Sequence, residues 1–308
     1  MTSRIHVNEV APRDGLQMEA RFVETRAKIA FVDALSECGF AKIEVTSFTS
    51  PRAIPALADA EIVMREIRRV PGVVYTALVP NLRGMERAIE SRVDELNLVM
   101  SCSEAHNGAN LGRSRARSLA QLLEIVRAAA SAGVRCNVSL STAFGCPFEG
   151  AVAPEEVVRL AGELVAGGAD GITLCDTTGM ADPMQVRRLF WRLEKLLPPS
   201  RLTIHLHDTR GLGLANALAA LEAGATRFDA SCAGLGGCPY APGASGNIGT
   251  ETLVHMLECL GRDTGVDLER LLAVARAVPA LIERAVASPL LLAGPRTRLH
   301  PMPAVLQQ

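Results

Sequence analysis

The fold follows from the stretch Gly167-Gly168-Ala169-Asp170-Gly171-Ile172-Thr173-Leu174, in which a helix end runs straight into a strand. Glycine after the last helical residue accepts the left-handed backbone that stops a helix. The same junction recurs after Gly39, Gly133 and Gly224, each time before strand-like sequence. A strand directly after a helix end is half of a βα unit. The chain is therefore predicted to alternate helices and strands.

Eight strands are expected, at 5–10, 41–47, 73–79, 93–100, 134–140, 170–175, 201–206 and 226–232. Helical patterns fill the gaps at about 24–39, 55–69, 82–91, 115–132, 154–167, 183–197 and 211–223. The repeat of about 28 residues suits an α/β fold of the (β/α)8 TIM-barrel type. An open doubly wound sheet is the alternative, but it needs a glycine-rich phosphate loop after its first strand. Val10-Ala11-Pro12-Arg13-Asp14-Gly15 is not such a loop.

Two further apolar stretches, at about 250–263 and 267–287, predict extra C-terminal helices. We expect a single TIM-barrel catalytic domain over 1–308, with the barrel at about 5–249 and the helical extension at about 250–308. Residues 294–308 are expected to be loosely held.

Composition excludes several classes of protein. The 308 residues carry 32 Lys and Arg against 33 Asp and Glu, so no broad basic surface for nucleic acid is expected. Hydrophobic residues make up 48% of the chain, which argues against disorder. No apolar run reaches the roughly 18 residues of a membrane span. Neither nucleic acid nor membrane is an expected partner.

The start of the chain and its cysteines indicate a compartment. Met1 leads directly into strand-like sequence without a signal core, so a cytoplasmic location with reduced thiols is expected. The eight cysteines form no C-x-x-C pair, which argues against a zinc knuckle. Cys38, Cys136, Cys175 and Cys259 are interpreted as small core residues.

Polar residues at the predicted strand ends form the candidate site, because TIM-barrel active sites lie there. His205 and His207 are two apart at the end of the seventh strand and share a face. With Asp14 and Asn247 they make a mixed nitrogen and oxygen donor set, which suits Mg²⁺, Mn²⁺, Co²⁺ or Zn²⁺ without choosing among them. The alternative is a histidine pair bonded to nearby carboxylates.

Arg13 and Asp14 follow the first strand and are expected to point different ways. Asp14 would face a metal, and Arg13 would meet oxyanion charge while pairing with Glu44, a carboxylate predicted to be buried in the second strand. A surface salt bridge between the neighbours is the alternative. Asp176, directly after the sixth strand, is interpreted either as a hydrogen-bond anchor or as a simple turn residue.

A loop rich in glycine and proline follows the eighth strand and carries Cys238. Such a loop can close over a ligand and reopen. Cys238 is therefore a candidate movable acid or base, or a nucleophile, rather than a packing cysteine. The stretch 107–117, with Asn110 and three arginines, is interpreted as a solvated helix start or as a phosphate contact.

These motifs resemble the 3-hydroxy-3-methylglutaryl-CoA lyase family. The resemblance covers about residues 5–285 and is carried by Val7–Gln17, Ile43–Phe48, Gly171–Gly179, His205–Gly211 and Ala233–Asn247. The cysteine loop is the most specific of these segments. The H-x-H-D segment is shared with the wider group of Claisen-type lyases and synthases.

The resemblance implies cleavage of 3-hydroxy-3-methylglutaryl-CoA to acetyl-CoA and acetoacetate, and a place in leucine degradation and ketone-body formation. It implies metal ligation by Asp14, His205, His207 and Asn247, with Mg²⁺ or Mn²⁺ expected. Catalytic roles are implied for Arg13, which supports the thioester enolate, and for Glu44, Asp176 and Cys238. The expected partner is an acyl-CoA substrate, and a homo-oligomer, taken as a dimer, is expected.

The sequence departs from the family in two places. Mitochondrial members resemble this chain but begin with a transit peptide and end in a cysteine-containing tripeptide, whereas this chain ends Val305-Leu306-Gln307-Gln308. Some relatives carry lysine near Ala20, where the nearest cation here is Arg21. The resemblance therefore implies a bacterial-type member and does not assign the CoA contacts.

Three other functions remain open from the sequence. One is a lyase for a related 3-hydroxyacyl-CoA such as citramalyl-CoA. Another is a Claisen-type synthase that joins an acyl-CoA to a 2-oxo acid, which would be expected to lack the cysteine loop. A non-catalytic metal-binding scaffold would need neither a mobile cysteine nor an arginine aimed at an enolate.

Overall fold

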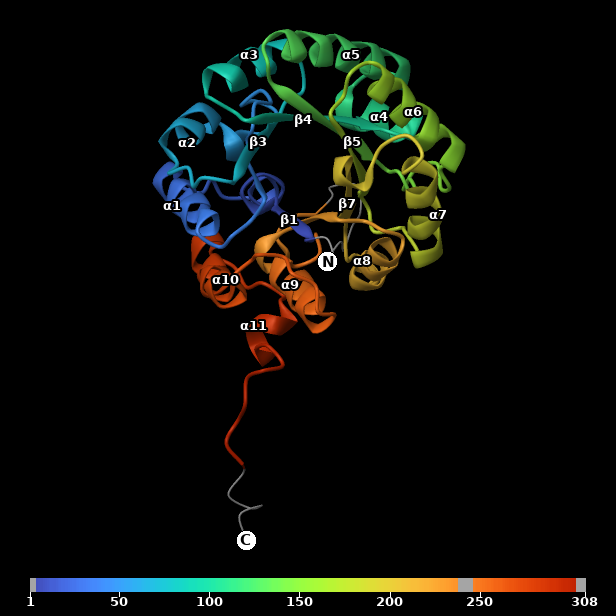
Figure 1. Ribbon diagram of the computed structural model, residues 1–308. Coiled ribbons are helices and arrows are strands. Elements are labelled where there is room, and N and C mark those ends of the chain that lie inside the picture. Colours follow the sequence, from blue (N-terminus) through green and yellow to red (C-terminus); the bar gives the residue numbers. More distant parts are fainter. Residues whose placement is uncertain (1–3, 238–245, 303–308) are drawn as a thin grey trace.

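The computed structural model describes residues 4–237 and 246–302 and shows a closed barrel of eight parallel strands (Figure 1). β1 pairs with both β2 and β8, so the sheet closes on itself. The predicted (β/α)8 TIM barrel is confirmed. The strands are β1 His6–Glu9, β2 Lys42–Ser47, β3 Val74–Leu78, β4 Glu95–Ser101, β5 Arg135–Ser141, β6 Gly171–Asp176, β7 Leu202–Leu206 and β8 Arg227–Ala230.

Helices form a ring around the barrel (Figure 1). They are α1 Thr25–Ser36, α2 Ala60–Glu66, α3 Leu82–Glu90, α4 Glu104–Leu111, α5 Arg115–Ser131, α6 Pro154–Ala166, α7 Pro183–Leu193 and α8 Gly213–Glu222. Short helical turns lie at η1 Ala11–Gly15, η2 Leu16–Met18, η3 Pro55–Leu57, η4 Pro199–Arg201 and η5 Cys232–Gly234. None of the helices in the described parts of the chain is long and apolar enough to cross a membrane.

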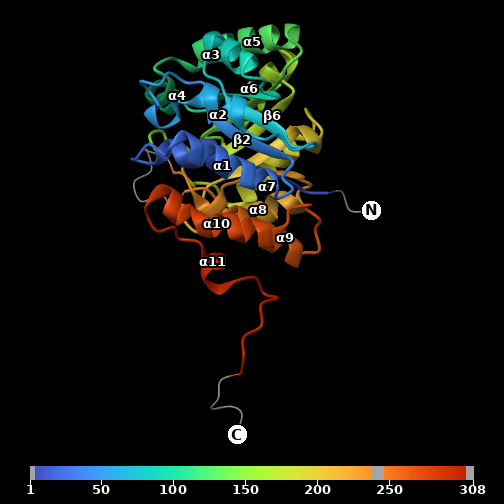
Figure 2. The same cartoon turned by 90° about the vertical axis from the view of Figure 1, so that its left-hand side faces the viewer.

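Three more helices follow the barrel, α9 Thr250–Cys259, α10 Leu268–Ile282 and α11 Pro289–Ala293. α9 packs against β1 and α10, and α10 packs against α1, so the extension covers the seam where the barrel closes. Residues 294–302 then lead away from the barrel (Figure 2). That the whole chain acts as one catalytic domain stays a prediction.

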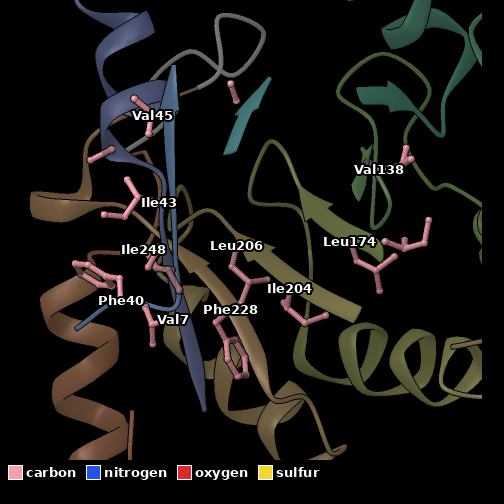
Figure 3. Close-up of a cluster of buried hydrophobic side chains, with 14 of the residues drawn as sticks. Val7, Phe40, Ile43, Val45, Val138, Leu174, Ile204, Leu206, Phe228 and Ile248 are labelled. Atoms are coloured by element: carbon pink, nitrogen blue, oxygen red, sulfur yellow. The ribbon is translucent and has the colours of Figure 1, made fainter. Parts of the chain in front are cut away.

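Alternation along each strand separates the two faces of the barrel wall. Ile204 and Leu206 of β7 are fully buried on the side opposite His205, because successive strand residues point to opposite faces. Figure 3 shows them in the apolar cluster with Val7, Ile43 and Phe228. The interior is polar instead, and is lined by Asn8, Glu44, Thr76, Asn97, Asn137, Thr173 and Asp229. The interior side chains can therefore supply chemistry at the barrel mouth.

The structure differs from the sequence expectations in three elements. The helix expected over 55–69 is a 3₁₀ turn, η3, followed by the shorter α2, with Asp59 at the junction. α4 was not predicted; Ser103 caps it by accepting the N–H of His106, and left-handed Gly112 ends it. The helix expected over 267–287 is the shorter α10, which ends at Ile282 before left-handed Glu283. The seventh strand ends at Leu206 as expected, and His207 beyond it forms an isolated bridge with Asn247.

Candidate active site

A cavity of about 750 Å³ opens at the carboxyl ends of the strands, where TIM-barrel active sites lie. Arg13, Asp14, His205, His207 and Asp229 line its floor. Its outer walls come from the loop after β1, the loop after β2 and the helix α4. The volume falls within the usual range for small-molecule sites, about 300–1,000 Å³.

A single π-helical turn, η1, carries Arg13 and Asp14 out of β1. The backbone N–H of Asp14 donates to the carbonyl of Val10 at 2.7 Å, and the N–H of Ala11 donates to the Glu9 carboxylate at 2.8 Å. The neighbouring side chains are both 8% exposed, so the alternative of a surface salt bridge does not hold. Arg13 reaches Glu44, and Asp14 reaches Asn247, but the two neighbours also form a buried salt bridge with each other, so they do not simply point different ways.

The side chains of Asp14, His205 and His207 converge, with one ligand atom of each lying within 4.8 Å of the others. The Nε2 atoms of the two histidines are 3.2 Å apart, and His205 Nε2 lies 3.9 Å from Asp14 Oδ2. Asn247 donates its side-chain N–H to Asp14 Oδ2 at 2.7 Å and to the carbonyl of Leu235 at 3.0 Å. The structure thus brings the four predicted metal ligands together.

Two features show that this donor set fits a divalent cation. The side-chain oxygen of Asn247, Oδ1, is buried without a hydrogen-bond partner, which is costly unless something accepts its lone pairs. His205 Nδ1 lies 3.3 Å from Asp229 Oδ2, so in the neutral ring the proton would sit on Nδ1 and the lone pair of Nε2 would face Asp14 and His207. One carboxylate, one amide oxygen and two imidazoles match the mixed preference of Mg²⁺, Mn²⁺ or Zn²⁺.

Charge in the cluster supports the same interpretation. Burial alone would raise the pKa of Asp14, but Arg13, the two histidines and the Asn247 amide outweigh it and lower that pKa to about 2. Burial and the neighbouring His205 lower the pKa of His207 to about 3. Asp14 is therefore an anion and His207 a neutral imidazole at neutral pH, which are the states that ligate metals.

Arg13 is held by a relay of buried side chains. Its Nε and Nη2 both lie 2.6 Å from Glu44 Oε2, and its Nη1 donates to Asp14 Oδ1 at 2.5 Å. Asn97 donates to the other oxygen of Glu44 at 2.7 Å. Asn137 and Ser139 in turn donate to the oxygen of Asn97 at 3.0 and 2.9 Å. The predicted pairing of Arg13 with Glu44 is present, with a supporting layer beneath it.

Burial and the contact between Arg13 and Glu44 act in opposite directions on both pKa values. Burial by itself would lower the pKa of Arg13, but Glu44 and Asp14 raise it above its usual range. Burial raises the pKa of Glu44, and Arg13 and Asn97 oppose that rise. Arg13 is therefore a permanent cation at the cavity floor, where a developing oxyanion would be stabilised.

Asp176 ends β6 and is 2% exposed. Its Oδ1 accepts the backbone N–H groups of Met180 at 2.7 Å and Ala181 at 3.0 Å, so it anchors the following turn. Its Oδ2 is buried without a hydrogen-bond partner, and burial raises its pKa to about 6. Asp176 does not line the cavity in the described residues, whereas its neighbours Cys175 and Thr177 do.

The loop that carries Cys238 lies outside the described residues, because the structure describes the chain up to 237 and again from 246. The two described ends of this loop meet closely. Gly236 has a φ of +109°, and a Cβ there would lie 2.5 Å from Asn247 Nδ2. A Cβ at Gly246, whose φ is +94°, would lie 2.5 Å from the carbonyl oxygen of Gly236. Glycine is therefore required where the loop leaves and re-enters the metal-ligand cluster.

Several functional candidates were missed or misjudged from the sequence. Asp229, which orients His205, was not singled out, although its position between apolar Phe228 and Ala230 on a strand places it on the interior face. Cys175, interpreted as core, lines the cavity. Cys259 was wrongly assigned to the core, since it is exposed at the end of α9.

The stretch 107–117 divides between cavity and surface. Asn110 lines the cavity from α4. Arg115 pairs with Glu104 at 3.0 Å and with Glu156 at 2.7 Å, and Arg113 donates to Gln121. These pairings support the helix-start interpretation over the phosphate contact. Arg21, the cation nearest to Ala20, is exposed and pairs with Glu283.

Residues 4–278 match the family model described as HMGL-like. The chain is 45% identical over 273 residues to hydroxymethylglutaryl-CoA lyase YngG of Bacillus subtilis, which covers 89% of this chain and 91% of that protein. It is 40% identical over 288 residues to the mitochondrial hydroxymethylglutaryl-CoA lyase of Homo sapiens, covering 94% of this chain and 89% of the human protein.

Solved structures give the same picture. The structure of an HMG-CoA lyase from Acinetobacter baumannii in complex with coenzyme A and 3-methylmalate matches with a TM-score of 0.95 and 48% identity, over 98% of this chain and 100% of that one. The carboxyl transferase domain of Rhizobium etli pyruvate carboxylase matches with a TM-score of 0.71 at 20% identity, over 94% of this chain and 50% of that one, which shows a shared fold alone.

Proposed function

The chain belongs to the HMGL-like family, and we propose that it is a divalent-metal-dependent lyase that cleaves 3-hydroxy-3-methylglutaryl-CoA to acetyl-CoA and acetoacetate. One observation carries the proposal beyond the family resemblance. Asp14, His205, His207 and the unpartnered Oδ1 of Asn247 meet at the floor of a cavity that also presents Arg13.

The reaction is a retro-Claisen cleavage. The proton of the tertiary hydroxyl leaves, the carbinol carbon becomes the ketone of acetoacetate, and the bond to the thioester methylene breaks. The electron pair of that bond forms the enolate of acetyl-CoA, which then takes a proton on carbon. A bound divalent cation would supply Lewis-acid polarisation of the hydroxyl. The four donors named above would hold it.

Arg13 is placed to stabilise the enolate of acetyl-CoA in this scheme. Hydrogen bonds to Glu44 and Asp14 hold the guanidinium in place, so it is already oriented before substrate arrives. A preorganised cation at the thioester oxygen stabilises the enolate more than the ground state and thereby lowers the barrier. Glu44 is a positioning residue in this scheme, since its oxygens bind Arg13 and Asn97.

The proton transfers are proposed for Cys238, with Asp176 as an anchor of the neighbouring turn. The support for Cys238 is its place in a loop whose two ends meet beside Asn247. The proton-transfer role of Cys238 itself stays a proposal from the family resemblance, because residues 238–245 lie outside the described part of the chain. Asp176 holds the turn after β6 through two backbone N–H groups, next to Thr177 of the cavity wall.

The test is acetyl-CoA release from 3-hydroxy-3-methylglutaryl-CoA by the purified protein. The protein is stripped with a chelator and assayed with and without Mg²⁺, Mn²⁺ or Zn²⁺. We expect activity only with added metal, and bound metal at one ion per chain. Metal-independent cleavage would overturn the metal role, and no cleavage with any ion would overturn the reaction.

A second acyl group belongs in the same assay. The Acinetobacter baumannii structure holds coenzyme A together with 3-methylmalate, a branched hydroxy diacid. We propose testing citramalyl-CoA and other branched hydroxyacyl-CoA thioesters beside the main substrate. A higher kcat/KM for one of them would change the acyl group and leave the chemistry in place.

Metal choice, cytoplasmic location, a dimer, and a role in leucine degradation and ketone-body formation remain proposals. The donor set of two oxygens and two imidazole nitrogens contains no thiolate, and within it we propose Mg²⁺ or Mn²⁺, the ions that the family resemblance implies. Light scattering across a concentration series checks the dimer.

A further inference from the structure

Away from the metal-ligand cluster, two loops contribute large apolar side chains to the wall of the cavity, beside residues of α4. Met18 and Phe22 belong to the loop after β1, and Ile54 and Pro55 to the loop after β2. Phe22 is 45% exposed although it is a large aromatic. Among the described residues that line the cavity, Arg13 is the one arginine or lysine, and it lies at the floor. We call the four apolar residues the outer wall.

One buried cation joins the two loops behind the outer wall. Lys28 of α1 is 3% exposed, and its Nζ donates to the carbonyl of Ala56 at 2.6 Å and to Asp59 Oδ1 at 2.7 Å. The same Nζ lies 4.0 Å from the centre of the Phe22 ring, a cation–π contact. Lys28 therefore contacts Phe22 of the first loop and both Ala56 and Asp59 of the second.

Burying a lysine costs desolvation, which an apolar side chain of similar size would avoid. An apolar side chain, however, could not hold the Ala56 carbonyl, the Asp59 carboxylate and the Phe22 ring in place together. The ring of Phe22 is held from behind, so its exposed face is turned to the cavity. The Ala56 carbonyl is held within the turn η3, directly after Ile54 and Pro55.

We propose that Lys28 is a positioning residue for the carrier arm of the acyl-CoA, and that the outer wall is the surface on which this arm lies. The proposal rests on the proposed function. The acyl group must reach Arg13 and the metal ligands at the floor, so the chain beyond its sulfur must run outward between the two loops. An apolar wall suits the methylene and amide segments of that chain, and a preset wall lowers the entropy cost of binding them.

The test compares two thioesters of the same acyl group, the full CoA ester and the N-acetylcysteamine ester, which lacks the rest of the carrier arm beyond its first amide. Lys28→Met should raise KM for the CoA ester by about tenfold or more and change kcat by less than about threefold. The short ester should keep its kcat/KM within about threefold. Lys28→Arg should restore much of the loss, because it keeps a cation at the ring and carbonyl.

Two further variants guard against a folding effect. Phe22→Ala removes an exposed ring of the outer wall and should reproduce the KM change without loss of stability. In Lys28→Met the buried carboxylate of Asp59 loses its cation. The double variant Lys28→Met/Asp59→Asn removes that unpaired charge and should again raise KM for the CoA ester while leaving the short ester unchanged. The matched control is Lys42→Met, because Lys42 pairs with Glu95 in a second buried bridge at the opposite end of the barrel. It should lower stability and leave KM alone.

An equal loss on both esters in Lys28→Met, no loss on either, or the same KM shift in Lys42→Met would overturn the proposal. Failure of the proposed function is distinguishable, because the wild-type protein would then cleave neither ester. Calorimetric binding of free CoA to wild type and Lys28→Met still decides the proposal in that case. Weaker CoA binding in the variant supports it, and equal binding overturns it.

Discussion

Arg13 and Glu44 meet through two donors on one oxygen, with Nε and Nη2 of the guanidinium each 2.6 Å from Glu44 Oε2. The second oxygen of Glu44 is taken by Asn97 at 2.7 Å. Arg13 therefore cannot turn without breaking a buried network, and its direction toward the cavity is set by residues that lie below it.

Glu44→Gln should slow turnover by about ten- to hundredfold, the usual cost when a group that orients a functional side chain is lost. The amide keeps the shape of Glu44 but removes the charge that binds Arg13. Metal content, measured by atomic absorption, should be unchanged, because Glu44 is not among the converging ligands. A variant with wild-type kcat would show that Arg13 is oriented without Glu44.

Arg13→Met should cut kcat by about two to three orders of magnitude, since one preorganised oxyanion donor is gone. Metal binding should survive, because Asp14, His205, His207 and Asn247 all remain. The measurement is steady-state kinetics together with metal stoichiometry. A fall of less than tenfold in kcat would remove Arg13 from the enolate role.

His207→Ala should lose most metal affinity and nearly all activity, because one of the converging ligands is removed. The readouts are metal stoichiometry after dialysis and acetyl-CoA release. His300→Ala, which changes an exposed histidine far along the chain, serves as the matched control and should behave like wild type. Full metal content in His207→Ala would end the ligand assignment.

Cys238→Ser should keep the fold and metal but lose about 10²–10⁴-fold in turnover, the range for a positioned acid or base. Serine is nearly the same size and far less acidic than cysteine. Alkylation should inactivate wild type, and bound substrate should slow it.

The structure adds a necessary control to that experiment. Cys175 also lines the cavity, so the labelled peptide must be identified and the labelling repeated on Cys175→Ala. Near-normal turnover of Cys238→Ser would make this cysteine a packing residue of the loop. Asp176 or a water molecule at the metal would then be the next acid to test.

Glu9 should make stability depend on pH. It is fully buried, and burial raises its pKa to about 8 against the opposing bonds from Ala11, Cys232 and Thr250. The unfolded pKa is near 4.5, so the folded protein binds the extra proton. Its contribution to stability is complete below pH 4.5 and is lost as the pH rises through 8.

Glu9→Gln removes this titration and should gain stability relative to wild type as the pH rises from 5 to 9, by about 1–3 kcal/mol. Urea denaturation at several pH values measures the difference in the free energy of unfolding between the two proteins. Glu86→Gln, an exposed change on α3, should show no pH-dependent gap. A constant gap for Glu9→Gln would mean that Glu9 is ionised in the folded protein at neutral pH.

The elements set by local chemistry could be predicted from the sequence. A left-handed glycine after a helix acts within a few residues, and Gly39, Gly133, Gly168 and Gly224 all have positive φ in the structure. The two-residue period of a strand likewise placed His205 toward the interior. α4 was missed, although Ser103 and Gly112 are the capping signals that mark its ends.

The supporting residues of the site could not be predicted in the same way. Asp229 reaches His205 across neighbouring strands, and Asn137 reaches Asn97 from the next strand along. Such contacts depend on the stagger between strands, which no local motif encodes. The contacts of Lys28 with Phe22 and Asp59 likewise appear only once two separate loops are packed together.

Asp14 and Asn247 are hydrogen-bonded partners separated by 233 positions, on either side of the seam between β1 and β8. A ribosome must therefore release most of the chain before this pair can form. A nascent or truncated product that lacks the last fifth of the sequence, residues 247–308, has Asp14, His205 and His207 but not Asn247. Cation affinity would thus report whether synthesis has passed the eighth strand and reached Asn247, because all eight strands of the barrel precede this residue.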